Sequence, residues 1–544
     1  MSGSKLGPHW VWSMLPLAVL GLACTIPAGK LGDVAPGSGS SGGGGDAQLP
    51  PEAQRVTVLE LDDAALDLLV VTDNSGSMGG RQSRVAQAVA GFAQQALANG
   101  ADLRIGFTTT DNGNPWCGTS EPEAGRLRLS SCASRLGDFV FSELIDVAEQ
   151  GCTDFCDLES LALSPTTTHL DAQPVVRPWV EVAPGQDNLG GLDLEQTVLC
   201  AAPQGIDGCG FESHLESMHK ALLRSESESD DSYGFLRPWA RLAVVFVTDE
   251  VDCSVNPTWD IFSSMGSRVF WSDPDAGQPT SAVCWNAGVE CENEGVDLGA
   301  CNPQNFDVEG NVTDVDGAVM YSLVRFIEEL EAIERSKEIY RLGDSVGIAV
   351  IGGVPEGYLE GEAELVYSFG GANSSAQFRD DFGVDPGCAE GAVNGGSAVP
   401  PVRLRTMAEL FPVGDRRTVA TVCRDDFSPV FDDIVQAYAV PRLEPVACIP
   451  GCLADVDSAV AGTQAQCDVV MTRAGTFERE STLVPACDGG DSAEACYRLR
   501  LDDDASECAQ GSNAALELVL PAGSPVLGQA TVEVACEMLP ASSC

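Results

Sequence analysis

The sequence predicts an α/β fold, a doubly wound parallel sheet with long disulfide-rich insertions, followed by a small, mostly β domain that is also disulfide-rich. Three observations support this prediction. Apolar runs typical of strands buried on both faces alternate with amphipathic helical segments from residue 64 onward. The helical period stops near residue 441, and short alternating runs with eight cysteines follow. A chain of 544 residues also exceeds what one core usually organises.

The first elements of the α/β region follow one another directly. "ALDLLVVT" is a nearly continuous apolar run and predicts a strand covered on both faces. The next segment, "SRVAQAVAGFAQQALA", places Val85, Val89, Phe92 and Leu97 on one helical face. The remaining elements, in chain order, are strands at 102–110 and 240–249, a helix at 318–341, a strand at 344–354, a helix at 403–411, a strand at 416–423 and a helix at 426–438.

Three stretches interrupt this alternation, near 111–200, 253–310 and 355–400. They are rich in Cys, Gly, Pro and Asp and show no sustained period. We therefore expect disulfide-pinned loop insertions, which are either functional or merely decorative. Residues 442–544 are expected to form the separate Cys-rich β domain.

The N-terminus has the features of an export signal. Residues 1–23 contain the run "WVWSMLPLAVLGLA", which is too short to span a membrane and is typical of a signal peptide. Cys24 follows it and resembles the lipidated cysteine of bacterial lipoproteins. Residues 24–61 are rich in Gly and Ser and predict a flexible tether. The protein is therefore expected to be lipid-anchored in the cell envelope, at the outer membrane or cell surface, or else freely secreted.

The cysteine count agrees with export. Of 21 cysteines, 20 remain if Cys24 carries lipid, so up to ten disulfides are expected in an oxidising compartment. Zinc binding is disfavoured because the close pairs "CTDFC" and "CIPGC" have no partner pair at zinc-finger spacing.

The charge balance also limits the partners. The chain has 81 acidic and 30 basic residues, a net charge of −51 that is spread along its length. Such a surface repels nucleic acid and anionic membranes and attracts divalent cations, although most of the carboxylates serve solubility. We expect no nucleic-acid partner and membrane contact only through a lipid anchor.

Polar residues gather where two apolar strands end. "VVTDNSGSM" contains Asp73, Ser75 and Ser77, and "VVFVTDEVDCS" contains Asp249. Ligand sites in doubly wound sheets lie outside the carboxyl ends of the strands. If these strands are neighbours, the two carboxylates and two hydroxyls face one crevice. Such hard oxygen ligands suit a divalent cation, and Gly76 is expected to let the backbone bend between the serines.

These residues resemble the von Willebrand factor A (vWA) domain, whose metal-ion-dependent adhesion site (MIDAS) has D-x-S-x-S after one strand and an aspartate after a later one. The resemblance covers about residues 62–441, and with the export features it is similar to cysteine-rich bacterial vWA lipoproteins or secreted proteins. It implies that Ser75 and Ser77 bind the metal directly, while Asp73 and Asp249 hold metal-bound waters. The implied cofactor is a divalent cation, Mg²⁺ first, with Ca²⁺ or Mn²⁺ as alternatives. The implied partner is a protein ligand that offers an Asp or Glu.

One position departs from the family pattern. The family supplies a threonine from another loop, but the corresponding stretch "GCGFESHLESMHKAL" has no threonine, and Glu212 or Ser213 lies near that place. One hypothesis is that Glu212 enters the metal shell and favours Ca²⁺. The alternative is that Glu212 points to solvent or caps the following helix. The nearby acids Glu250 and Asp252 are expected to support the site indirectly or to be solvated.

The sequence leaves several function classes. The first is a metal-dependent binding or adhesion module that is not an enzyme. The second is an envelope enzyme whose catalysis resides in the insertions or the C-terminal domain, with the vWA region recruiting substrate. A third is a degenerate site that serves only as scaffold. The sequence "HLESMH" lacks the spacing of a zinc peptidase, and no serine-hydrolase elbow or phosphate-binding loop is present.

Overall fold

The protein is described here from a computed structural model. The model describes residues 56–539, except for short gaps at 115–116, 118–119, 143, 372–374, 390–395, 443–444, 458, 461–462, 488–494, 502–504, 506–507, 509–511 and 522–526. The expected signal peptide, the lipidation site at Cys24 and most of the expected tether lie outside the described residues. In the described part of the chain, we find no helix with the length and apolarity needed to cross a bilayer.

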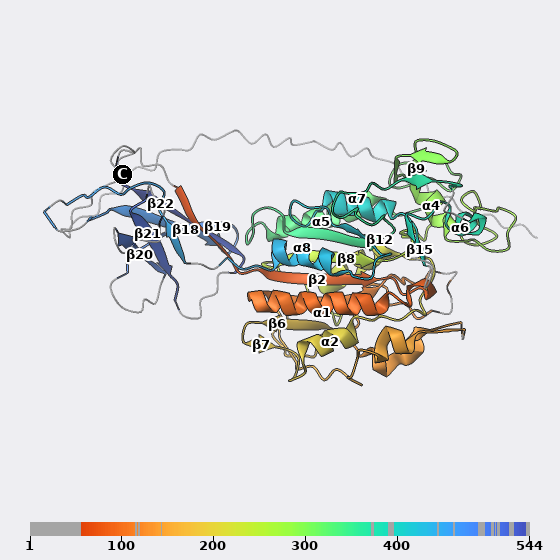
Figure 1. The fold of residues 1–544 in the computed structure, drawn as a ribbon, viewed down its shortest axis with the longest axis horizontal. Helices are drawn as coiled ribbons and strands as arrows, with labels where there is room; N and C mark the ends of the chain where they lie inside the picture. Colours follow the sequence, from red (N-terminus) through yellow and green to blue (C-terminus); the bar gives the residue numbers. More distant parts are fainter. Residues whose placement is uncertain are drawn as a thin grey trace, which may run out of the picture. The chain divides into compact units, whose positions relative to one another are not determined.

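The largest sheet has seven strands in the order β16-β12-β8-β2-β3-β6-β7 (Figure 1). Its first five strands are parallel to their neighbours, whereas β6 is antiparallel to β3, and β7 is antiparallel to β6. The strand bounds are β2 Ala65–Thr72, β3 Asp102–Thr109, β6 Trp179–Ala183, β7 Gln186–Asp187, β8 Arg241–Val247, β12 Val346–Gly352 and β16 Val419–Thr421.

The expectation of a purely parallel sheet is therefore corrected to a mixed α/β sheet. The antiparallel strand β6 comes from the first predicted insertion, near 111–200, which also supplies helix α2 (Leu194–Ala201) to the core. The segment "WVEVA" is short, yet Trp179, Val180 and Val182 are buried. A five-residue strand inside a long irregular stretch gives too weak a periodic signal to be separated from a loop.

Helices cover both faces of this sheet. On one face, α1, α2 and α8 pack against alternate strand residues such as Leu68 and Val70. On the other face, α3, α5 and α7 pack against the intervening residues, such as Leu69 and Val71. The helix bounds are α1 Gln82–Asn99, α3 His214–Ser225, α4 Ala282–Gly288, α5 Leu323–Lys337, α6 Ala376–Phe382, α7 Val402–Leu410 and α8 Ser428–Tyr438. The continuous apolar strands follow from this two-sided burial.

The insertions are pinned by disulfides. Nine bridges join two cysteines that both lie in the described residues: Cys117–Cys209, Cys132–Cys152, Cys156–Cys200, Cys253–Cys284, Cys291–Cys301, Cys388–Cys423, Cys448–Cys508, Cys467–Cys536 and Cys487–Cys496. Disulfides at this density are typical of proteins outside the reducing cytosol.

The insertions also form short paired elements. These are four antiparallel pairs: β4 Val140–Phe141 with β5 Ile145–Asp146, β9 Val289–Cys291 with β11 Cys301–Pro303, β10 Asp297–Gly299 with β13 Tyr367–Ser368, and β14 Cys388–Ala389 with β15 Ser397–Ala398. The first insertion also contains two short helical segments, η3 Cys132–Phe139 and η4 Glu149–Thr153.

The C-terminal region is a β structure with its own apolar core. One sheet has the order β1-β22-β18-β19, and the other has the order β17-β21-β20. The strand bounds are β1 Val56–Asp62, β17 Val446–Cys448, β18 Cys467–Ala474, β19 Arg479–Val484, β20 Cys496–Leu501, β21 Ala514–Val519 and β22 Gln529–Cys536.

The first of these strands lies in the stretch that we expected to be a tether. Residues 56–61 were assigned to the tether at 24–61, but they form most of β1, which is antiparallel to β22. Leu59 and Leu61 are buried in the C-terminal core. The end of the expected tether is thus an ordered strand, because its apolar residues have a sheet face to cover.

Candidate metal centre

The two acidic motifs meet at the carboxyl ends of adjacent strands. β2 and β8 are parallel neighbours, and their last paired residues are Thr72 and Val247. Asp73 follows the first strand directly, and its backbone N–H donates to the carbonyl of Val247 at 2.9 Å. Asp249 lies two residues beyond the end of β8. The structure therefore brings both predicted aspartates to one edge of the sheet, as the strand pattern indicated.

The D-x-S-x-S turn folds back on its own aspartate. The backbone N–H of Ser75 donates to Asp73 Oδ1 at 2.8 Å, and the hydroxyls of Ser75 and Ser77 lie 2.9 Å apart. Asp73 and Ser75 are buried, whereas Ser77 is exposed. A short 3₁₀ turn, η1 Gly76–Met78, holds the two serines in this relation. The two serine hydroxyls therefore lie next to each other, as the spacing of the motif predicts.

Gly76 is required by a close contact and not by an unusual backbone angle. Its φ does not lie in the left-handed region, so a bend alone does not explain the glycine. A Cβ at this position would lie 2.9 Å from the ring of Phe141. A side chain at residue 76 would force the ring of Phe141, on β4, to move. This contact, and not a bend, is what the structure shows for Gly76, which corrects the expectation above.

A hydrogen bond and an ion pair connect the turn to the second strand end. Ser77 Oγ donates to Asp249 Oδ1 at 3.0 Å. The guanidinium of Arg81 contacts the other oxygen of Asp249, and both side chains are only 3% exposed. Arg81 Nη1 also lies 3.3 Å from the carbonyl of Ser77. Sequence reasoning missed Arg81, although it is the first cation after the serine motif and lies four residues beyond Ser77.

Thr248 and Thr110 complete the arrangement, and neither was predicted. Thr248 Oγ1 donates to Asp73 Oδ2 at 2.7 Å. Thr110, at the end of β3, donates its hydroxyl to Glu212 Oε2. All of these side chains are buried. Threonine is common in strands because it favours β structure, so neither Thr110 nor Thr248 stands out from the sequence as a site residue.

Glu212 is inside the protein. Its side chain is fully buried, and its Oε1 atom has no hydrogen-bond partner among the described residues. The interpretation that Glu212 points to solvent is therefore wrong. It does not cap α3 either, because Asp252 accepts from the N–H of Leu215 at 3.0 Å, and Ser254 accepts from that of Glu216 at 2.9 Å.

The other two nearby acids are also buried. Asp252 accepts a hydrogen bond from Arg403 Nε at 2.9 Å in addition to its contact with the first turn of α3. It is a structural anchor of that helix, and the expectation of a solvated side chain is wrong. Glu250 is 9% exposed, and its backbone N–H donates to Thr248 Oγ1 at 2.9 Å.

The carboxyl cluster has more negative charge than its surroundings balance. Burial, followed by the charge of Asp249, raises the pKa of Asp73 to about 6. Burial, followed by the charges of Asp73 and Glu250, raises the pKa of Glu212 well above its usual value. Burial, followed by the charges of Asp73 and Asp249, raises the pKa of Glu250 in the same way. Each carboxylate therefore disfavours ionisation of the others.

This environment fits a divalent cation. The available donors are the hydroxyls of Ser75 and Ser77 and the carboxyl groups of Asp73 and Asp249, and Glu212 nearby has one buried oxygen without a partner among the described residues. A cation would offset the charge repulsion that adds to burial in raising the three pKa values. Asp73, Ser75, Ser77, Asp249 and Glu212 are the residues that would hold it.

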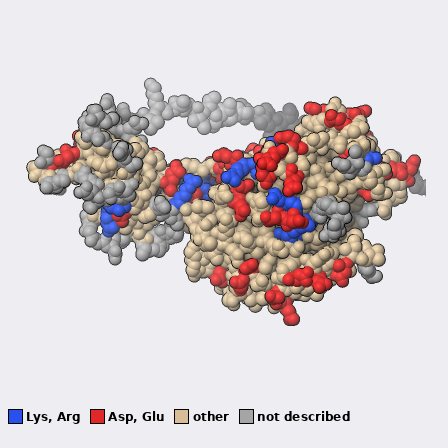
Figure 2. All heavy atoms as spheres, viewed as in Figure 1, with Lys and Arg blue, Asp and Glu red and all other residues tan. Residues whose placement is uncertain are grey.

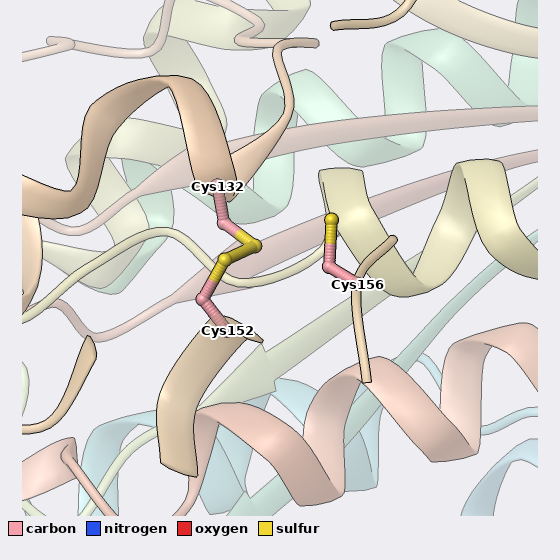
Figure 3. A group of neighbouring side chains, drawn as sticks. All are labelled: Cys132, Cys152 and Cys156. Carbon is pink, nitrogen blue, oxygen red and sulfur yellow. A yellow bond between two sulfur atoms is a disulfide. The ribbon is translucent and has the colours of Figure 1, made fainter. Parts of the chain in front are cut away.

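A second cluster of potential metal ligands is occupied by disulfides. The sulfur atoms of Cys132, Cys152 and Cys156 lie within 4.8 Å of one another (Figure 3). Two of them are bonded to each other, and Cys156 is bonded to Cys200. A metal would need thiolates, which these sulfurs do not provide in the oxidised protein.

Comparison with known proteins gives little similarity. No protein-family model matches the chain. No curated protein matches it. Among solved structures, it is similar to SpaC from Lactobacillus rhamnosus GG, with 10% identity, a TM-score of 0.26, and coverage of 89% of this chain and 41% of that chain. It is also similar to RrgA from Streptococcus pneumoniae, with 9% identity, a TM-score of 0.20, and coverage of 90% and 58%.

Both are pilus adhesins. The present chain spans about half the length of these structures. TM-scores this low do not establish a shared fold. A function for this chain can therefore be inferred only from its own residues.

Proposed function

We propose that this chain is an exported binding protein with a vWA-like, doubly wound domain, in which a divalent cation at the ends of β2 and β8 captures an acidic side chain of a protein ligand. One observation supports the proposal most. Asp73, Ser75, Ser77 and Asp249 contact one another in series although the two motifs are far apart in sequence. A strand end that only connects to a loop does not require four oxygen-bearing side chains to meet at one place.

The residues have distinct parts in this proposal. Ser75 and Ser77 provide neutral oxygens, and Asp73 and Asp249 provide charge and hold water. A bound divalent cation supplies a positive centre that an outside carboxylate can complete. Ser77 is the exposed member of the set, so the partner would approach from its side.

Glu212 tunes the centre in this proposal. It replaces the family threonine, and its unpartnered oxygen lies in a cluster already rich in carboxylates. An additional negative ligand weakens the attraction for an outside carboxylate and favours Ca²⁺, which accepts more oxygens and looser geometry than Mg²⁺. We therefore propose Ca²⁺ or Mn²⁺ as serious competitors of Mg²⁺ in this protein.

The binding role is proposed to be non-enzymatic and to act at the cell surface. The disulfides support a location outside the cytosol. The expected lipid anchor at Cys24 would hold the domain at the envelope, and secretion is the alternative. The competing hypothesis is an envelope enzyme whose catalytic residues lie in the insertions or the C-terminal domain.

A capture experiment tests the proposal. The immobilised protein is incubated with envelope and culture-medium proteins in Mg²⁺ or Ca²⁺, in parallel with EDTA and with the variant Asp73→Ala. We expect a defined set of proteins that is retained with cation, released by EDTA and absent from Asp73→Ala. An identical set under all three conditions would contradict the proposal, and turnover of a generic substrate panel would support the enzyme hypothesis.

A further inference from the structure

A cavity of about 630 Å³ lies between α3, the loop that follows β3 and the loop that begins at Cys253. It borders the candidate metal centre but is not part of it. Ser213, which lines the cavity, follows Glu212 directly, and the N–H of Cys253 donates to the carbonyl of Glu212 at 2.7 Å. Its volume is in the range of sites for small organic ligands.

Aromatic side chains form much of the wall. Trp259, Phe262 and Tyr321 line the cavity, and two of them are held by other contacts. Phe262 packs edge-on against Phe211, with ring centroids 4.8 Å apart. The guanidinium of Arg325 lies over the ring of Tyr321 at 3.9 Å. The wall is therefore largely preformed and presents flat apolar surfaces, which suit another ring.

The disulfide Cys253–Cys284 ties down the loop that carries this wall. Cys253 itself lines the cavity. A cross-link at the wall limits collapse of the space when it is empty, which favours a pocket that exists before ligand binds.

Two polar groups at the cavity lack partners. Trp259 Nε1 and Asn112 Oδ1 are buried atoms with no hydrogen-bond partner among the described residues. Asn112 cannot turn freely to relieve this, because its Nδ2 donates to the carbonyl of Ser213 at 3.0 Å. A buried N–H without an acceptor is costly, so a small movement of the Trp259 ring that brings Nε1 to a ligand oxygen would gain a hydrogen bond.

A cation lies on the same wall. Lys220 Nζ is 3.8 Å from Glu216 Oε1, which is a long contact. The other oxygen of Glu216 receives a closer contact from Arg325 at 2.7 Å. Because Arg325 already balances Glu216, the Lys220 ammonium keeps donors for an anionic group.

We propose that this cavity binds an aromatic group that carries a carboxylate or carbonyl oxygen, with the ring against Trp259, Phe262 and Tyr321 and the oxygen near Trp259 Nε1 and Lys220. The same chemistry occurs in a free aromatic acid and in an aromatic residue of a peptide with its main-chain carbonyl. The inference goes beyond the metal-dependent capture proposed above and does not depend on a cation.

Calorimetric titration of the full exported chain tests the proposal with four probes. These are 1-naphthylacetate, 1-naphthylacetamide, the apolar analogue 1-methylnaphthalene, and N-acetyltryptophanamide. We expect naphthylacetate to bind with a Kd below about 1 mM. We expect methylnaphthalene to bind about tenfold more weakly, because it lacks the oxygen. If N-acetyltryptophanamide binds more tightly than naphthylacetamide, the natural source is a peptide; the reverse order indicates a free aromatic compound.

Variants separate the two polar contacts. Lys220→Met should weaken naphthylacetate about tenfold and leave naphthylacetamide unchanged, because only the anion uses the charge. Trp259→Phe should weaken both oxygen-bearing probes but not methylnaphthalene. Arg335→Met removes an exposed cation of α5 that does not line the cavity, and it should change none of the affinities. The melting temperature of each variant is measured to check that the variant is folded.

Asp73→Ala distinguishes this proposal from the metal centre. The probes should bind that variant, and the wild type in EDTA, as tightly as the untreated protein. Loss of probe binding in Asp73→Ala would assign the probe to the metal centre and overturn the proposal. Equal affinity for all probes, or no binding up to about 10 mM, would also overturn it.

Discussion

Ser77 donates a hydrogen bond to Asp249 at 3.0 Å and thereby joins two strand ends that are 172 residues apart. The contact needs β2 and β8 to be parallel neighbours in the register that pairs Thr72 with Val247. One exposed hydroxyl thus belongs both to the serine turn and to the later acidic loop. Its removal should affect cation binding more than folding.

Ser77→Ala is expected to lower the affinity for Mg²⁺ and Ca²⁺ about tenfold or more, because it removes a proposed ligand oxygen. The free energy of unfolding of the metal-free protein should fall by only about 1 kcal/mol, the usual value of one hydrogen bond. Calorimetric titration and urea unfolding measure the two quantities. Ser83→Ala, on α1, is the matched control. Equal loss of affinity in both variants would contradict a specific role for Ser77.

Arg81→Gln is expected to raise the affinity for divalent cations. The guanidinium contacts Asp249 in a buried pair, so it competes with a cation for the same carboxylate. At an effective dielectric near 20, removing a positive charge about 4 Å away is worth up to about 4 kcal/mol, and solvation reduces this to roughly a tenfold change. Weaker cation binding in Arg81→Gln would show that Arg81 supports the centre instead of competing with the cation.

Glu212→Thr introduces the residue type that the vWA resemblance implies near this position. We expect it to shift selectivity from Ca²⁺ toward Mg²⁺, because a neutral oxygen replaces a carboxylate. The ratio of the two dissociation constants is the measurement. Glu360→Thr changes a carboxylate outside the cluster and is the control. An unchanged ratio would exclude Glu212 from the metal shell.

The stability of the metal-free protein should depend on pH in an unusual direction. The pKa of Asp73 is raised to about 6, so the native state binds a proton more tightly than the unfolded chain does. A native state that binds more protons loses stability as pH rises, here between about pH 4 and pH 6. The raised pKa values of Glu212 and Glu250 act in the same direction.

Urea unfolding in EDTA across this range measures the slope. Asp73→Asn should flatten it, because the amide does not titrate. Saturating Ca²⁺ should reverse it, since cation binding requires ionised carboxylates. A slope that is unchanged in Asp73→Asn would mean that other groups cause the effect.

A buried ion pair at the opposite end of β2 provides a prediction for folding alone. Arg237 Nε lies 2.7 Å from Asp67 Oδ1, and the side chains are 2% and 0% exposed. Arg237→Met leaves the Asp67 carboxylate buried without its partner, so we expect a loss of about 3–5 kcal/mol in the free energy of unfolding. Cation affinity should not change. The double variant Arg237→Met with Asp67→Leu should recover much of the stability.

The strands of the α/β region could be predicted because burial on both faces requires a nearly continuous run of apolar residues. Residues 65–72 were expected as a strand and form β2 with the same bounds, and the helix with Val85, Val89 and Phe92 buried is α1. The antiparallel strand β6 could not be predicted in this way, because five residues within an irregular stretch produce no clear period. The strand β1 at residues 56–62 could not be predicted either, because it follows a Gly/Ser-rich stretch that has no strand pattern.

The candidate metal centre was only partly predictable. Asp73, Ser75, Ser77 and Asp249 form a recognisable motif, and their contact requires only adjacent parallel strands. The contacts of Thr110 with Glu212 and of Arg81 with Asp249 are different, since each joins segments whose approach depends on loop conformation. Nothing in the local sequence around Thr110 distinguishes it from a threonine that only packs.

The most direct test of the central claim is whether this cluster binds a divalent cation. Mn²⁺ binding to the EDTA-treated, dialysed protein can be followed by electron paramagnetic resonance, with Mg²⁺ and Ca²⁺ as competitors. We predict one tight site in the wild type that both competitors displace and that Asp73→Ala lacks. Equal Mn²⁺ binding by the wild type and Asp73→Ala would contradict the claim.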